Sequence, residues 1–388
     1  MHLTRLQLSN FRSWAELDLD LRPGITLISG ANAAGKSNLI EAAYMLASLR
    51  STRAQTEGEL IRWNIETPQV MRIAGAALAD SEPVQVEVAL TARTGGGTGA
   101  ARQRSGAPLT SKRIRVNGVA KRASDALGSN RAVQFTTLDL ELLTGSSAVR
   151  RRYLDVAVGQ LQRSHASNLS RYQRALTQRN ALLKRIVEGR AAESELQQWD
   201  ELLEASATPI WESRADAAAS LSTFAADRHL ALRSPDDPAE ILGLSYSPAN
   251  SQTLQESRRR DLARGTTSVG PHRDELLIDL DGRPAANFAS RAQQRVAALS
   301  MRLAEADFLA ARSSDSPILL LDDVFSELDP PRRSRTAEAV SAVEQVILTT
   351  ADPASVPFAQ SDLTASYAIV DGALFATRDA PSDGESAP

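Results

Sequence analysis

The chain of 388 residues contains no cysteine, which excludes disulfides and thiolate metal sites and is compatible with a reducing cytoplasm. Aromatic residues make up only 4% of the sequence. No stretch approaches the roughly 20 apolar residues that a membrane-spanning helix needs. Residues 1–5 lack the basic and apolar blocks of a secretory signal. We therefore expect a cytoplasmic protein with no membrane association.

An excess of either charge is also missing. The 44 basic and 47 acidic side chains give a formal net charge of −3. This value argues against a protein that coats DNA by charge alone, but it is compatible with a basic groove on an acidic body. The length is sufficient for one large domain or for two to three lobes.

A phosphate-binding loop is the clearest motif, because residues 30–37 follow the pattern Gly-x4-Gly-Lys-Ser. Residues 24–29 predict a short buried strand before the loop, and residues 38–46 predict a helix after it. In this context Lys36 reaches the β- and γ-phosphates of ATP, and the Ser37 hydroxyl ligates Mg²⁺. The expected nucleotide-binding residues are Gly30, Ala31, Asn32, Ala33, Ala34, Gly35, Lys36, Ser37 and Asn38.

A second acidic motif follows the apolar run at 318–321 and consists of Asp322 and Asp323. The run predicts a buried parallel strand that delivers both carboxylates to its C-terminal edge. Asp322 is expected to hold Mg²⁺ and Asp323 to act as the general base for the attacking water. Together with Lys36 they are the expected catalytic residues.

Three features of the second half favour an ABC-type ATPase head. Residues 289–293 are similar to the ABC signature, and they precede a helical run with Ser290 as its expected N-cap. Residues 325–329 resemble the D-loop of such heads. Thr349 or Thr350 stands where transporter ATPases carry a histidine, which predicts slow hydrolysis. The expected fold is α/β, with a mixed sheet and a helical lobe inserted between the phosphate loop and the signature.

The expected domain organisation has four parts. Residues 1–150 form the N-terminal part of the head, 151–240 the helical lobe, 241–376 the C-terminal part of the head, and 377–388 a disordered tail. In the lobe, Leu161, His165 and Leu169 begin one apolar helix face, on which His165 is a packed core residue rather than a ligand. The Gly/Arg-rich segment 93–113 is either a flexible hairpin tip or a DNA-contacting loop.

Four stretches are typical of one family, the RecF recombination mediators of bacterial gap repair. They are residues 10–12, 145–155, 270–274 and 321–329. The chain resembles this family from its first residue to about Asp352.

The resemblance implies a head-to-tail homodimer around two ATP molecules, each held by Lys36 of one subunit and Ser290 of the other. Such a dimer clamps double-stranded DNA, favours junctions of single- and double-stranded DNA, and acts with RecO and RecR to load RecA during DNA repair and replication. A weak, DNA-stimulated ATP hydrolysis then releases the clamp.

The DNA-binding surface is expected on basic helical residues of the lobe, as salt-sensitive and sequence-independent phosphate contacts. A solvated helix face, or arginines that pin the lobe, is the alternative. The main candidates are Arg150, Arg151, Arg152, Arg171 and Arg174, with Arg179, Lys184, Arg185 and residues 258–260 as further ones.

Three other classes of protein compete with this interpretation. A transporter ATPase subunit predicts an intact glycine signature and a switch histidine, and both are absent. An SMC-like structural ATPase needs a much longer coiled-coil insert. A non-hydrolysing adapter agrees with the altered signature but not with Asp322 and Asp323.

Overall fold

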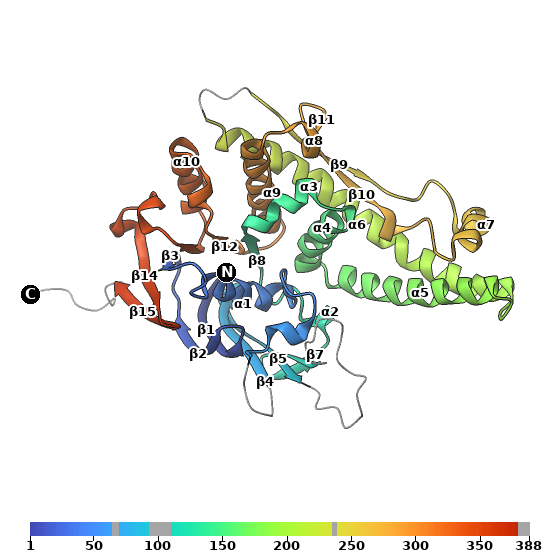
Figure 1. The fold of residues 1–388 in the computed structure, drawn as a ribbon, viewed down its shortest axis with the longest axis horizontal. Helices are drawn as coiled ribbons and strands as arrows, with labels where there is room; N and C mark the ends of the chain where they lie inside the picture. The colour runs from blue at the N-terminus through green and yellow to red at the C-terminus, as the bar shows by residue number, and fades with distance from the viewer. Residues whose placement is uncertain (64–69, 93–109, 235–238, 379–388) are drawn as a thin grey trace, which may run out of the picture. The chain divides into compact units, whose positions relative to one another are not determined.

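The computed structural model describes residues 1–63, 70–92, 110–234 and 239–378. They form two compact units (Figure 1). Unit 1 combines Met1–Thr137 with Leu309–Pro388, and unit 2 comprises Leu138–Phe308. In the described part of the chain, no helix is long and apolar enough to cross a membrane.

The central sheet of unit 1 has the strand order β15-β14-β3-β13-β12-β8. All neighbouring pairs are parallel except β14 with the edge strand β15. The strands are β3 (Gly24–Gly30), β8 (Ala132–Phe135), β12 (Ile318–Asp322), β13 (Gln345–Thr350), β14 (Leu363–Val370) and β15 (Ala373–Arg378). Helices α1 (Lys36–Ser48) and α10 (Pro330–Ser341) belong to the same unit. This arrangement confirms the expected mixed α/β head.

A second sheet of unit 1 is antiparallel, in the order β2-β1-β4-β5-β6-β7. Its alternating sequence buries one face, as with Val86, Val88 and Leu90, and leaves the other face polar. Asn117 and Gly118 take positive φ angles at the predicted hairpin turn. The strands are β1 (His2–Phe11), β2 (Trp14–Asp20), β4 (Val70–Ala79), β5 (Glu82–Ala92), β6 (Thr110–Val116) and β7 (Val119–Lys121).

Unit 2 is mainly helical, with the small sheet β11-β10-β9. Its long helices are α4 (Ser147–Leu161), α5 (Arg163–Val187), α6 (Leu196–Leu232) and α9 (Arg291–Ala311), the last of which ends beyond the unit boundary. The remaining elements are α3 (Glu141–Thr144), β9 (Leu242–Ser247), α7 (Leu254–Arg264), β10 (Glu275–Leu280), β11 (Arg283–Pro284) and α8 (Ala285–Phe288).

Short helical segments complete both units. They are α2 (Ala123–Ala126) and the 3₁₀ segments η1 (Glu57–Leu60), η2 (Thr137–Leu140), η3 (Glu193–Glu195), η4 (Pro271–Arg273), η5 (Phe325–Glu327), η6 (Pro353–Ser355) and η7 (Gln360–Asp362). Thr377 and Arg378 belong to β15 rather than to the tail expected at 377–388, and the rest of that tail lies outside the described residues. The Gly/Arg-rich segment 93–113 also lies outside them up to residue 109.

The apolar helix face predicted from Leu161 onward is divided between two helices. Leu161 ends α4, and Gln162, with φ −124° and ψ 99°, separates it from α5. The prediction of one continuous helix is wrong here because a single extended residue leaves the apolar spacing almost unchanged. His165 lies in α5 and is only 2% exposed, which confirms its place in the core.

A buried arginine joins three helices of the lobe. Arg179 on α5 donates to Asp200 on α6 (2.6 Å), to Asp261 on α7 (2.7 Å) and to Thr267 (2.8 Å). Its side chain is fully buried. Because a buried guanidinium cannot reach DNA, the prediction of Arg179 as a phosphate contact is wrong. Its carboxylate partners, distant in the sequence, instead compensate its charge.

A buried carboxylate organises the rest of unit 2. Asp274 accepts hydrogen bonds from Trp211 Nε1 (3.1 Å), the Ala249 amide (2.8 Å), Arg214 Nη1 (2.6 Å) and the Tyr246 hydroxyl. Burial and the hydrogen bond to Asp274 raise the pKa of Tyr246, which keeps its hydroxyl a donor. The stretch at 270–274 therefore contributes to the interior of unit 2.

We predict that Asp274→Asn destabilises the protein by roughly 2–4 kcal/mol, because an amide nitrogen would face donors and leave Arg214 less compensated. The measurement is the free energy of unfolding in urea. The matched control is Glu204→Gln on the exposed side of α6, where we expect a change within about 0.5 kcal/mol. Equal stability of the two variants would contradict the role assigned to Asp274.

Candidate active site

Three neighbouring parallel strands bring the two sequence motifs of unit 1 to one sheet edge. Strand β13 pairs with β3 on one side and with β12 on the other. In this register Thr349 lies opposite Ile28 and also opposite Asp322. The phosphate loop leaves β3 at the same carboxyl edge where Asp322 and Asp323 end β12. Ligand sites of open parallel sheets lie at this edge.

The phosphate loop has the backbone that an anion site requires. Gly35 takes φ +109° as the N-cap of α1. A Cβ atom there would lie 2.9 Å from Ser13 Oγ and 3.3 Å from Trp14 Nε1. Trp14 Nε1 also donates to the Gly35 carbonyl (3.2 Å). The unpaired amides of the first turn of α1 therefore open toward the loop and can bind phosphate oxygens.

Lys36 closes the loop from inside. Its Nζ donates to the carbonyls of Gly30 (2.7 Å) and Ala31 (2.9 Å), and the residue is 6% exposed. The ammonium group is thus held at the mouth of the loop, where phosphate oxygens would replace the two carbonyls. Ala33 adopts φ +66°, at a cost of about 1–2 kcal/mol relative to a glycine.

The end of β12 provides two different carboxylates. Thr349 Oγ1 donates to Asp322 Oδ1 (2.7 Å), so the residue at the expected switch position orients Asp322. Asp323 has φ +55°, and its amide donates to the Thr349 carbonyl (3.1 Å). Its buried Oδ1 atom has no hydrogen-bond partner among the described residues. A buried acceptor without a partner is costly, and a water molecule in the site would satisfy it.

The donor set fits a hard cation only in part. Among the described residues, no group of three or more histidine, cysteine or acidic side chains could hold a metal. Ser37 and Asp322 offer one hydroxyl and one carboxylate, and Mg²⁺ takes its remaining ligands from phosphates and water in sites of this kind. The residues therefore fit Mg²⁺ together with a nucleotide.

A polar network beside the loop was not predicted from the sequence. The fully buried Glu41 of α1 accepts from Arg12 (3.0 and 3.1 Å) and from Ser51. Arg53 donates to Asn38 (3.2 Å). Only the Asn10-Phe11-Arg12 stretch hinted at a role for this turn. The other partners come from segments that no local pattern connects.

The D-loop stretch directly continues the acidic motif. The Ser326 hydroxyl donates to the Asp323 carbonyl (2.9 Å), and Asp329 caps α10 through the Arg332 amide (3.0 Å). A nucleotide-dependent change at Asp323 therefore has a short covalent path to this exposed segment.

The signature-like segment belongs to unit 2 and has the predicted cap. The Ser290 amide donates to Gln293 Oε1 (2.7 Å), and the Gln293 amide donates to Ser290 Oγ (3.2 Å). This reciprocal pair is a capping box at the start of α9. Ser290 and Arg291 are both exposed. The hydroxyl and the helix N-terminus are thus accessible on the surface of this unit.

The DNA candidates fall into two groups. Arg150 pairs with Glu275 (2.7 Å) and donates to the Gly145 carbonyl (2.8 Å). Arg151 donates to the Asp274 carbonyl (2.7 Å), and burial together with the nearby Arg214 lowers its pKa. These two guanidinium groups are occupied within unit 2.

Arg152 is exposed at the end of the same run, and it has an interaction partner within the structure. Arg171 and Arg174 are exposed on α5, which carries six lysines and arginines and no acidic residue between 163 and 187. These α5 side chains are therefore the most accessible of the predicted DNA contacts.

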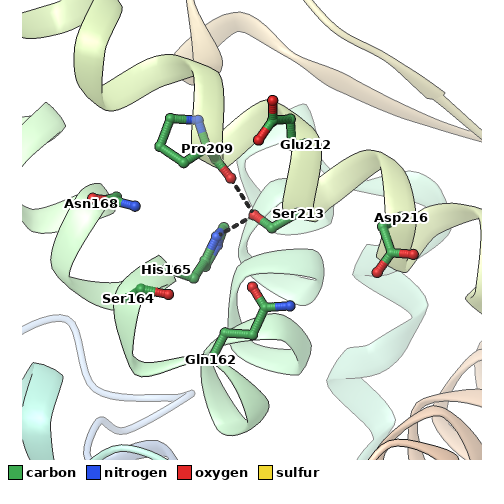
Figure 2. Close-up of a pocket in the computed structure, with 8 residues that line it drawn as sticks. All are labelled: Gln162, Ser164, His165, Asn168, Pro209, Glu212, Ser213 and Asp216. Carbon is green, nitrogen blue, oxygen red and sulfur yellow. Dashed lines mark hydrogen bonds between the residues drawn. The ribbon is translucent and has the colours of Figure 1, made fainter.

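A pocket of about 300 Å³ lies between α5 and α6 (Figure 2). On its wall, His165 lies 2.7 Å from Ser213 Oγ and 3.0 Å from Asp155 Oδ1, an order similar to a hydrolase triad. Both Asp155 oxygens are also paired with Arg214, and the His165 side chain is fully buried. We therefore assign this chain of hydrogen bonds to joining α4, α5 and α6.

The comparisons with known proteins agree with this site. The family model described as "RecF/RecN/SMC N terminal domain" matches residues 2–367. The "DNA replication and repair protein RecF" of Herpetosiphon aurantiacus is 40% identical over 364 residues, which cover 90% of this chain and 93% of the relative. The protein of that name from Roseiflexus castenholzii is 37% identical with the same coverage.

Solved structures give the same result. A structure titled "recombination mediator protein RecF-ATP in RecFOR pathway" has a TM-score of 0.81 at 27% identity and covers 97% of this chain and 98% of its own. An Smc head domain from Pyrococcus furiosus, at 17% identity and a TM-score of 0.54, shares the fold. The chain therefore belongs to the RecF family of DNA replication and repair proteins, within the wider RecF/RecN/SMC group.

Proposed function

We propose that the protein is an ATP-controlled clamp on duplex DNA that works in recombinational gap repair. The observation that carries this proposal is the gathering of Lys36, Asp322 and Asp323 at one edge of three paired strands. The family membership and the RecF–ATP structure at a TM-score of 0.81 support ATP as the ligand.

In this site Lys36 and the loop amides bind the phosphates of ATP, and Ser37 and Asp322 hold Mg²⁺. The ion neutralises the charge that develops on the phosphate oxygens. Asp323 uses its unpartnered oxygen to orient a water molecule and to accept its proton. The water oxygen then bonds to the γ-phosphorus, and the bond to the bridging oxygen of ADP breaks. Thr349 keeps Asp322 in position but supplies no proton acceptor, which agrees with slow hydrolysis.

The clamp itself is a homodimer in which Ser290 of one subunit faces the nucleotide of the other. The capped, exposed N-terminus of α9 is suited to this role, because free amides at a helix start favour anionic oxygens. An ATP molecule that bridges two subunits stabilises only the dimer, so it shifts association by mass action. Hydrolysis removes that bridge and releases the DNA.

Helix α5 is the proposed DNA contact in unit 2. Arg163, Arg171, Arg174 and Arg185 share the polar side of α5 and are exposed. From the first to the last of them the helix rises about 33 Å, close to the roughly 34 Å of one DNA turn. Such contacts are made to phosphates, so they suit duplex DNA and single-/double-strand junctions without sequence preference. The relatives' names place the protein with RecR, RecO and RecA in loading single-stranded gaps, and stimulation of hydrolysis by DNA belongs to the same proposal.

A transporter ATPase subunit is the second candidate, and it has less support. That role requires a membrane-protein partner, and the RecF relatives at 33–40% identity are named for DNA replication and repair instead.

Lys36→Ala is predicted to weaken ATP binding at least 100-fold, because it removes the one ammonium group held at the loop. Asp323→Asn should bind ATP normally and lose hydrolysis by a factor of about 100 or more. Fluorescent-nucleotide titration and single-turnover hydrolysis separate the two effects. Normal binding by Lys36→Ala would show that the nucleotide lies elsewhere.

Ser290→Ala should retain ATP binding and lose ATP-dependent dimerisation, since its hydroxyl acts on the nucleotide of the other subunit. Sedimentation velocity with ATP, ADP and no nucleotide measures the dimer fraction. The control is Ser220→Ala, a serine in the middle of α6. An ATP-dependent dimer of undiminished stability in Ser290→Ala would contradict the assignment of this residue.

Replacing both Arg171 and Arg174 by glutamine is predicted to lower the salt dependence of duplex binding, with a slope smaller by about 1.8 in log K against log salt concentration. The same variant should hydrolyse ATP normally without DNA. The matched control replaces Gln173 and Gln178 of the same helix by alanine, which removes no charge. A slope equal to that of the unmodified protein would exclude α5 as a phosphate contact.

A further inference from the structure

The solvent-facing side of the antiparallel sheet in unit 1 carries several arginines at its β4–β7 end. Directly opposed residues of an antiparallel pair project from the same face. The register pairs Arg113 with Ala89 and Arg115 with Glu87. Val86, Val88 and Leu90, which alternate with these β5 positions, are fully buried on the other face. Arg113 and Arg115 therefore point to solvent.

Strand β7 adds another arginine to this face. Lys121 lies opposite the buried Ile114, so it projects from the inner side at the sheet margin. Because side chains alternate along an extended chain, the next residue, Arg122, continues the row of Arg113. Both Arg113 and Arg122 are exposed.

Carboxylates compensate little of this charge. Glu87 pairs with Arg72 of β4 (2.8 Å) and lies 3.6 Å from Arg115. No ion pair is recorded for Arg113 or Arg122 within the described ranges. Four guanidinium groups thus share one carboxylate on four adjacent strands. We call Arg72, Arg113, Arg115 and Arg122 the sheet arginine patch.

The opposite end of the same sheet has the reverse charge. There Arg5 pairs with Asp18 and lies 3.8 Å from Asp20, and Glu16 is exposed beside them. Opposite charges at the two ends polarise the face, so an anionic partner is drawn to the β4–β7 end and repelled from β2.

The surroundings of the patch indicate what kind of anion it binds. The neighbouring outward residues are small or polar, namely Gln85, Ala89, Thr91, Ser111 and Ala120. Protein–protein interfaces depend on aromatic or aliphatic anchors in their centre, and this face offers none among its described residues. Arginine, in contrast, binds phosphate oxygens through two parallel hydrogen bonds.

The spacing also suits a phosphate backbone. Residues two apart on a strand lie about 6.8 Å from each other, and neighbouring strands lie about 4.8 Å apart. The patch therefore spreads its cations over a width of several phosphates, since each DNA strand carries one charge per 3.4 Å or so of axis.

We propose that the sheet arginine patch is a second contact surface for the backbone of duplex DNA, separate from helix α5. This inference rests on the proposed binding of duplex DNA. Arg113 and Arg122 make the direct phosphate contacts, and Glu87 holds Arg72 and Arg115 beside them. The contacts are independent of base sequence, and their contribution adds to that of α5.

The test uses the full chain with ATP and a fluorescein-labelled duplex of mixed sequence. Fluorescence anisotropy over a series of salt concentrations gives the slope of log K. In R113Q/R122Q we expect the slope to fall by about 1.8, because each lost phosphate contact removes about 0.9. R113K/R122K keeps both charges and should keep the slope. The matched control is R5Q/R22Q, which removes two exposed charges from the same unit away from the patch.

Each outcome decides a different point. A reduced slope in R113Q/R122Q with an unchanged slope in R5Q/R22Q supports the patch. An unchanged slope in R113Q/R122Q, or an equal reduction in both variants, overturns it while leaving α5 as the DNA contact. If the unmodified protein fails to bind duplex DNA in any nucleotide state, the proposed function is wrong and the patch proposal falls with it. Circular dichroism and ATP binding confirm that each variant is folded.

Discussion

The pairing of β13 between β3 and β12 is the constraint on which the site depends. The phosphate loop and the acidic motif lie at opposite ends of the sequence, and only this register places their strand ends side by side. A shift of one residue would turn Asp322 to the other face of the sheet. The buried apolar runs of β12 and β13 hold the register, because their side chains are enclosed on both faces.

Within this frame the nucleotide site is built from parts that are held ready. Lys36 is kept at the loop by backbone carbonyls, Thr349 fixes Asp322, and Asp323 keeps one buried oxygen without a partner. Preorganised groups of this kind act on charge that develops during reaction without first having to reorient. The same groups also explain why a bound nucleotide, rather than its turnover, is the controlling event in the proposed clamp.

Arginine has two distinct uses in this chain. In the interior of unit 2, Arg179 and Arg214 each join several carboxylates and link helices that are far apart in sequence. Such buried groups are costly to leave unpaired, so they specify one arrangement of the helices. On the surface, α5 and the sheet arginine patch leave their charge open to an anionic partner. The overall charge of −3 conceals this division.

The sequence by itself determined the phosphate loop, the acidic strand, the cap at Ser290 and the mixed α/β head, because each depends on local spacing and on the residue types of a few neighbours. Only the tertiary structure decided which arginines are buried. Arg171, Arg174 and Arg179 lie on one helix, yet only Arg179 meets carboxylates from α6 and α7. Burial and ion pairing depend on segments that are distant in sequence, so no local pattern could separate these residues.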